Sequence, residues 1–110
     1  MNCKKISAII RTSALGQVQA RLKEVGVKGL SVFPVLGFGE YVADWTFHPH
    51  QLVQHMKLEI WAHDEMVDQI VSAILDAART GLPGDGMVTV LPVDKVWRVR
   101  THQEATADEL

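Results

Sequence analysis

Residues 64–81, DEMVDQIVSAILDAARTG, decide the fold class of this chain. Their apolar side chains recur at helical spacing, at positions Val67, Ile70, Val71, Ile74, Leu75 and Ala78. Asp64 is placed to cap the N-terminus, acidic residues fill the first turn, and Gly81 is placed to end the segment. The segment therefore predicts an amphipathic helix with one broad apolar stripe, which needs a sheet or a second helix to pack against.

Short strands are predicted on both sides of this helix. Residues 56–62, MKLEIWA, alternate in polarity, and residues 87–92, MVTVLP, follow the helix after a glycine-rich turn. In residues 4–11, KKISAIIR, the side chains of Ile6, Ala8 and Ile10 alternate on one face, and residues 29–36, GLSVFPVL, have the β-branched and aromatic content of a strand. Pro34 inside the latter predicts a bulge or an edge position, because proline cannot donate a ladder hydrogen bond.

A second helix is predicted over residues 13–26, SALGQVQARLKEVG, with Ser13 as its cap and Gly26 as its C-terminal glycine. Residues 96–100 form a small extra strand near the C-terminus. The resulting order is β-α-β-β-α-β plus that extra strand, which is an α+β, ferredoxin-like sandwich.

Apolar residues occur on both faces of the predicted strands. Ile9 stands beside Ile10, and Val90 stands beside Leu91. Two helices cover only one face of such a sheet, so we expect the other face to be buried against further copies of the chain. The pattern predicts a closed homo-oligomer.

Size and composition bound the function. The chain has 110 residues, 47% of them hydrophobic and 22% charged, which fits a single domain at residues 1–101 and a polar, frayed tail at residues 102–110. A formal net charge of -2 gives no general reason to bind nucleic acid or an anionic membrane. The lone Cys3 and the short apolar run at the start favour a cytoplasmic protein without a leader or a membrane insertion.

Three stretches resemble the P-II signal-transduction (nitrogen regulatory) proteins. They are residues 4–11, residues 24–39, EVGVKGLSVFPVLGFG, and residues 57–101, in which RTG..GDG is followed by LPV and R.RT. The resemblance implies a homotrimer of ferredoxin-like subunits with adenine nucleotides in the clefts between subunits. It also implies a non-catalytic regulator whose long loop, here residues 40–55, docks onto a transporter or an enzyme.

The resemblance also implies a nucleotide site. Gly84, Asp85 and Gly86 match the family's phosphate-binding turn, where backbone N–H groups can face anionic oxygens. Arg98 and Arg100 match two arginines that reach the phosphates. The simpler interpretation is that the glycines only make a tight turn and that the arginines are solvated strand residues.

Further residues extend this implied site. Gly29 and Ser31 lie where the family contacts the adenine, and Gly37, Phe38 and Gly39 match the hinge into the long loop.

Two departures from the family pattern affect ligand choice. Glu40 and Tyr41 stand where the family has Arg-Gln, and Met87 stands where it has the lysine after the turn. The loss of positive charge predicts ADP or AMP in preference to ATP. Without the metal-orienting glutamine and the carboxylate-pairing lysine, we expect no 2-oxoglutarate sensing of the usual kind. Tyr41 is interpreted as a packing residue.

The loop also contains histidines. In an extended segment His48 and His50 face one side, so they could bind a divalent metal with His55 as a third ligand. This suggests an alternative, a metal-responsive or metal-tolerance trimer. Histidines in a partner-docking loop are the simpler interpretation. A small ferredoxin-like phosphohydrolase is a third class, but the chain has no nucleophile and base in a recognisable pattern, so we expect no enzyme.

Overall fold

The computed structural model describes residues 1–42 and 51–110. Its main elements follow the predicted order: β1 (Cys3–Ile10), α1 (Leu15–Glu24), β2 (Ser31–Gly37), β3 (Val53–His63), α2 (Val67–Ala78) and β4 (Gly86–Pro92). Two short strands follow, β5 (Trp97–Arg98) and β6 (Gln103–Glu104). Single 3-10 turns occupy Thr12–Ala14, Asp64–Met66 and Ala107–Glu109.

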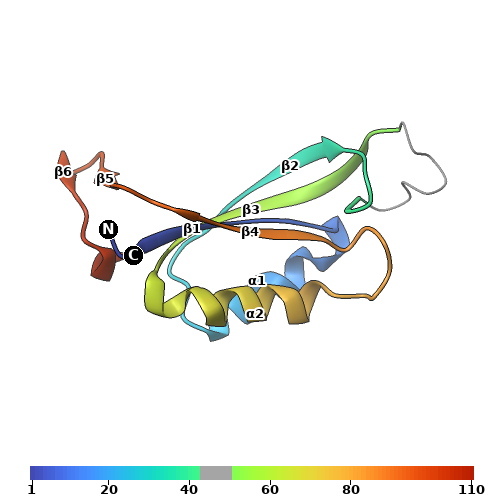
Figure 1. The fold of residues 1–110 in the computed structure, drawn as a ribbon, viewed down its shortest axis with the longest axis horizontal. Helices are drawn as coiled ribbons and strands as arrows, with labels where there is room; N and C mark the ends of the chain where they lie inside the picture. Colours follow the sequence, from blue (N-terminus) through green and yellow to red (C-terminus); the bar gives the residue numbers. More distant parts are fainter. Residues whose placement is uncertain (43–50) are drawn as a thin grey trace.

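The four long strands form one antiparallel sheet in the order β2-β3-β1-β4, and β5 pairs with β6 in a separate two-stranded sheet. Both helices lie on one face of the large sheet (Figure 1). This confirms the α+β, ferredoxin-like prediction. Pro34 lies on β2, an edge strand, as predicted.

The core lies between the helices and the sheet. It is built from alternate residues of β1 and β3 and from the inner stripes of both helices: Ile6, Ala8, Ile10, Val18, Leu22, Leu58, Ile60, Ile70 and Ile74. Leu75 belongs to the predicted stripe of α2 but is 52% exposed. The buried stripe of this helix is therefore narrower than the sequence predicted.

One predicted helix boundary is confirmed and another is wrong. Gly26 has φ +91°, and its N–H donates to the carbonyl of Lys23 while Val27 N–H donates to Leu22, which is a glycine-capped helix end. By contrast, Ser13 lies inside a 3-10 turn and makes no capping hydrogen bond.

The caps of the second helix also differ from prediction. His63, not Asp64, caps the turn before α2, because His63 Nδ1 accepts from the N–H of Glu65 at 3.1 Å. The Asp64 carboxylate pairs instead with Lys4 Nζ at 2.7 Å. The helix ends at Ala78, before Gly81.

The C-terminal residues are not frayed. Ala105 is 4% exposed, and its N–H donates to the carbonyl of Val96 at 2.8 Å. The Glu109 carboxylate lies 3.0 Å from Arg98 Nε. A buried alanine and an ion pair hold this polar segment against the domain. Among the described residues, no helix is both long enough and apolar enough to span a bilayer.

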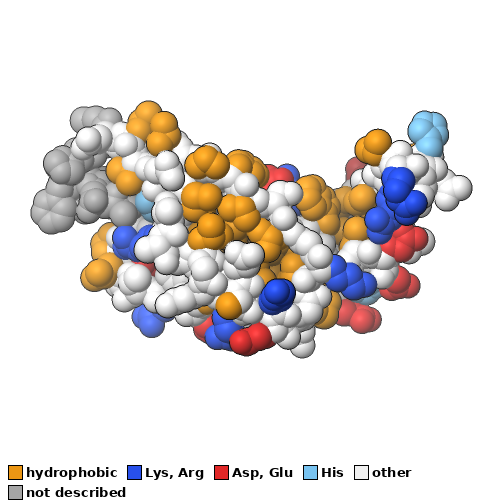
Figure 2. Space-filling model, turned by 180° about the vertical axis from the view of Figure 1, so that it is seen from behind, with side chains coloured by type: hydrophobic (Ala, Val, Ile, Leu, Met, Phe, Trp, Pro, Cys, Tyr) orange, Lys and Arg blue, Asp and Glu red, His pale blue; other side chains and the backbone are white. Residues whose placement is uncertain are grey.

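The sheet face away from the helices is apolar but carries a charged centre. Large apolar side chains on this face include Ile9, Phe33, Trp61, Met87 and Leu91. Glu59 lies between two lysines, 3.2 Å from Lys5 Nζ and 3.7 Å from Lys57 Nζ. Figure 2 shows apolar side chains gathered across the middle of the molecule. The prediction of a second apolar face holds for its margins and is wrong for its centre.

Gly86 fixes how closely β4 approaches β1. It has φ +109°, and a Cβ added there would lie 1.7 Å from the carbonyl oxygen of Ile9. Any side chain would force the two strands apart, and the positive φ would be strained as well. Gly86 is therefore required where the glycine-rich turn enters the sheet.

We expect Gly86→Ala to lower the free energy of unfolding by about 2 to 4 kcal/mol, because it combines overpacking with a strained φ. Urea denaturation measures this. The matched control is Gly16→Ala in α1, where an added Cβ has no atom within 4 Å. That change should leave stability equal or up to about 1 kcal/mol higher, because alanine favours helix. A Gly86→Ala protein as stable as the parent would contradict the close-approach argument.

Candidate functional site

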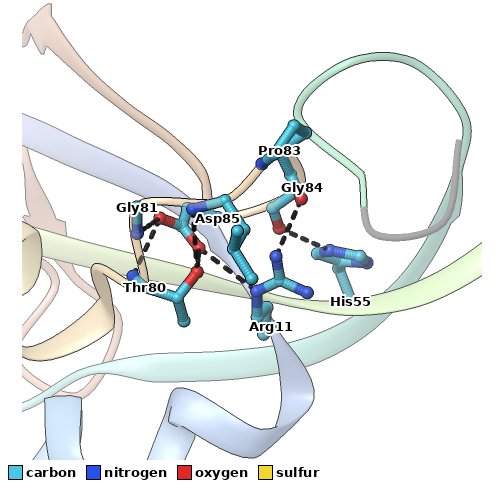
Figure 3. Close-up of polar contacts among 8 residues, drawn as sticks. Arg11, His55, Thr80, Gly81, Pro83, Gly84 and Asp85 are labelled. Atoms are coloured by element: carbon cyan, nitrogen blue, oxygen red, sulfur yellow. Dashed lines mark hydrogen bonds and ion pairs between the residues drawn. The ribbon is translucent and has the colours of Figure 1, made fainter. Parts of the chain in front are cut away.

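The turn between α2 and β4 is organised around the Asp85 carboxylate. One carboxylate oxygen accepts the backbone N–H groups of Thr80 and Gly81, each at 2.9 Å. The other accepts the Thr80 hydroxyl and the Nε of Arg11, the latter at 3.2 Å (Figure 3). The carboxylate therefore has four donors, from the end of α2 and from the residue after β1.

These contacts decide the protonation of Asp85. Burial alone raises the pKa of its carboxyl, but the hydrogen bonds from Thr80, Gly81 and Arg11 outweigh burial and lower the pKa to about 2. The side chain is an internal anion at neutral pH. It occupies the N–H groups of Thr80 and Gly81, so an external anion must use other donors of the turn.

Arg11 makes a second contact with the turn. Its Nη2 donates to the carbonyl of Pro83 at 2.8 Å. Because the N–H and C=O of a trans peptide point in opposite directions, this bond orients the N–H of the next residue, Gly84, away from Arg11. Arg11 and Thr80 were not singled out from the sequence. Their role depends on the contact between the end of β1 and the turn, and this contact cannot be predicted from the local sequence.

Gly84 connects the turn to the loop at residues 40–55. Its N–H donates to the carbonyl of Glu40 at 3.1 Å, and its own carbonyl lies 3.2 Å from Nε2 of His55. Gly84 has φ +99°, a backbone conformation that favours glycine. A carbonyl can only accept, so His55 Nε2 carries the hydrogen of this bond.

The position of His55 bears on the metal hypothesis. His55 is 2% exposed, and its Nε2 is committed to Gly84. His48 and His50 lie outside the described residues. Within residues 1–42 and 51–110, no three histidine, cysteine or acidic side chains form a group that could hold a metal ion. The three-histidine site stays a hypothesis.

The residues predicted for nucleotide binding form two separate groups. The first, which we call the glycine half-site, surrounds the α2–β4 turn and the end of β2: Gly37, Phe38, Gly39, Gly84, Asp85, Gly86 and Met87. Phe38 and Met87 are exposed, and Tyr41 packs beside Gly39. Glu40 belongs to the same region through its bond to Gly84.

The second group, the arginine half-site, lies at the start of β2 and in the β5–β6 hairpin: Gly29, Ser31, Arg98 and Arg100. Gly29, Ser31 and Arg98 line one open cavity of about 360 Å³ together with Trp61 and Glu109. In this chain Arg98 is paired with Glu109, and Arg100 is exposed in the turn after β5.

The two half-sites are well separated in one chain, because Arg98 and Arg100 lie in the β5–β6 hairpin and Ser31 lies opposite Glu59 in the middle of β3, away from the α2–β4 turn. The molecule is elongated, with a longest axis of 48 Å, and the β5–β6 hairpin lies toward one end of it while the α2–β4 turn lies toward the other (Figure 1). One phosphate chain cannot reach both groups in a single copy. The predicted residues converge only if the glycine half-site of one chain meets the arginine half-site of another.

Removal of the Asp85 charge should loosen the turn. We expect Asp85→Asn to lower the free energy of unfolding by about 1 to 3 kcal/mol, since an amide offers one acceptor oxygen where the carboxylate has two.

The contribution of Asp85 to the free energy of unfolding should decrease as the pH falls. The pKa of Asp85 is depressed in the folded state, so its contribution is complete above about pH 4 and is lost as pH falls towards about 2. Urea denaturation between pH 5 and pH 2 should show this loss in the parent and a smaller one in Asp85→Asn. The control is Asp94→Asn, at an exposed position in the β4–β5 connection. Parallel pH profiles for parent and Asp85→Asn would contradict the assignment.

Comparisons with known proteins identify the family of this chain. The family model described as "Nitrogen regulatory protein P-II" matches residues 3–103. A protein of that name from Pasteurella multocida is 38% identical over 92% of this chain and 95% of its own length. Its namesake from Microchaete diplosiphon is 37% identical over 94% and 96%.

The fold comparison gives the same result. A crystal structure of Arabidopsis thaliana PII bound to citrate superposes with a TM-score of 0.80 at 35% identity, covering 94% of this chain and 89% of that one. Residues 3–103, which the family model matches, contain both helices and all the residues of the two half-sites. The chain therefore belongs to the nitrogen regulatory protein P-II family.

Proposed function

We propose that this chain is a non-catalytic signal-transduction protein that assembles as a homotrimer and binds an adenine nucleotide between neighbouring chains. In each cleft the glycine half-site of one chain faces the arginine half-site of the next. Occupancy of the cleft changes the loop at residues 40–55, which contacts a partner protein. Membership of a family of regulatory proteins, not of enzymes, supports this class of function.

The separation of the half-sites carries the proposal. A cyclic assembly that repeats one head-to-tail contact brings the two ends together at every interface. The half-apolar sheet face gives such an assembly a surface to bury. The citrate bound to the Arabidopsis protein is an anion, which supports an anionic ligand for the family's fold.

The chemistry of the glycine half-site favours a short phosphate chain. The carbonyl of Glu40 is bonded to Gly84, so the Glu40 carboxylate belongs to the same region as the turn. A carboxylate about 6 Å from a phosphate costs on the order of 1 to 3 kcal/mol at an effective dielectric near 20. Met87 offers no compensating charge. We infer that ADP or AMP binds at least as well as ATP and that 2-oxoglutarate is not sensed in the usual way.

We propose that the partner is a transporter or an enzyme and that the protein acts in the cytoplasm. A metal-responsive trimer that uses His48 and His50 stays an alternative without a supporting contact among the described residues.

The site between chains can be tested by complementation. Arg98→Ala/Arg100→Ala should weaken ADP binding at least about tenfold, because charge-assisted hydrogen bonds contribute about 1.5 to 3 kcal/mol each. Met87→Glu should also weaken it by placing a negative charge beside the turn. When the two variants are unfolded together in equal amounts and refolded, about one cleft in four should combine an intact half-site from each chain.

Calorimetry would then show ADP binding recovered at about a quarter of the parent stoichiometry. Each variant refolded alone is the control and should show no recovery. A mixture that binds no better than the separate variants would place the site within one chain, and a 12.2 kDa species by light scattering would exclude the assembly.

Phosphate preference provides an independent test. Glu40→Arg/Met87→Lys reverses the charge of the glycine half-site, so the ratio of ATP to ADP affinity should rise about tenfold or more relative to the parent. Calorimetry with each nucleotide measures this. A parent protein whose ATP affinity increases when 2-oxoglutarate and Mg²⁺ are added would contradict the ligand assignment.

A further inference from the structure

One residue of the turn holds both ends of the loop at residues 40–55. The N–H of Gly84 donates to the carbonyl of Glu40, the first residue of the loop, at 3.1 Å. At the other end of this segment, the carbonyl of Gly84 accepts from Nε2 of His55, which already lies on β3, at 3.2 Å. These two bonds lie on successive peptide groups of the turn that we propose to bind phosphate.

The Glu40 end of the loop is folded locally. We call residues 39–42 the loop root. The N–H of Val42 donates to the carbonyl of Gly39 at 3.0 Å, and the Val42 side chain is 1% exposed. The ring of Tyr41 lies against Gly39, because a Cβ added to that glycine would be 3.1 Å from it. The closed root therefore buries an apolar side chain, and its first carbonyl, that of Glu40, is bonded to Gly84.

The His55 end is held differently. His55 is buried on β3, where it lies opposite Val35 of β2 in the sheet register. Its bond to Gly84 uses a carbonyl, and an anion does not compete for an acceptor. Ligand binding at the turn therefore leaves this contact in place.

The Glu40 contact, by contrast, uses a donor that an anion would also use. Arg11 holds the Pro83 carbonyl at 2.8 Å, and so fixes the opposite direction for the Gly84 N–H. That N–H has one hydrogen to donate. Charge-assisted bonds to an anionic oxygen are roughly twice as strong as bonds between neutral groups, so a phosphate oxygen is a better acceptor than the Glu40 carbonyl.

We propose that the Gly84 N–H is a shared donor, which the Glu40 carbonyl occupies in the unliganded protein and a nucleotide phosphate oxygen takes over on binding. Loss of the Glu40 contact opens the loop root and exposes Val42, while His55 keeps the other end of the loop on Gly84. This inference rests on the proposed nucleotide site and adds the direction of the change: the ligand releases one end of the loop and retains the other.

Thiol labelling of the loop root tests the inference. Cys3 is the only cysteine, so Cys3→Ala/Val42→Cys carries a single thiol at the buried root position. Saturating ADP should raise the rate at which this thiol reacts with a disulfide reagent about fivefold or more. This factor is the change in the opening equilibrium that corresponds to the loss of one ordinary hydrogen bond. The matched control is Cys3→Ala/Val18→Cys, at a buried position of α1, whose rate ADP should not raise.

A second pair of variants tests the same coupling between the loop root and the nucleotide site by measuring ADP affinity. Val42→Ala weakens the closed root, so more molecules have the Gly84 N–H available, and ADP affinity should rise about two- to tenfold. Val18→Ala removes the same two methyl groups from the core and should leave ADP affinity unchanged.

The outcomes separate this inference from the function on which it rests. ADP binding by calorimetry with no change in the Val42→Cys labelling rate would overturn the shared donor and leave the nucleotide site standing. An ADP affinity that falls in Val42→Ala would also overturn it. Absence of ADP binding to the parent protein would overturn both.

Discussion

The turn that joins α2 to β4 depends on one partly buried charge. A partly desolvated carboxylate is tolerated only when donors surround it, and Asp85 has four, from Thr80, Gly81 and Arg11. This internal anion ties the helix end to the residue after β1. Gly84 and Gly86 flank Asp85, and both have a positive φ, which glycine adopts readily. The path of the α2–β4 turn is thus held by contacts within the chain.

Periodic segments were predicted well because their signal is local. Alternation in β1 and β3 and the 3.6-residue stripe of α2 are set by which face meets the core. The errors occurred where a distant residue competes. Asp64 is a good cap by composition, but Lys4 takes its carboxylate. The tail is polar by composition, yet Ala105 is buried within it, and a single alanine gives no visible pattern.

The site was predicted as a set of residues but not as an arrangement. The family resemblance identified both half-sites, whereas distance along the chain says nothing about their separation in space. His55 shows the limit most clearly. As one of three loop histidines it suggested a metal ligand. In the structure β3 already begins at Val53, so His55 lies in the sheet and bonds to the carbonyl of Gly84. The burial of His55 and its register in the sheet depend on tertiary structure, so they cannot be predicted from the sequence of the loop alone.

Because the two half-sites lie far apart in one chain (Figure 1), a ligand that uses both of them would be a cross-link between chains. Such a ligand binds the assembled protein and has no complete site on a dispersed chain. By mass action each filled cleft then adds RT ln(1 + [L]/Kd) to the free energy of assembly. Dilution of the protein would weaken apparent ligand affinity, and nucleotide supply would set how much of the protein is assembled when the chain is scarce.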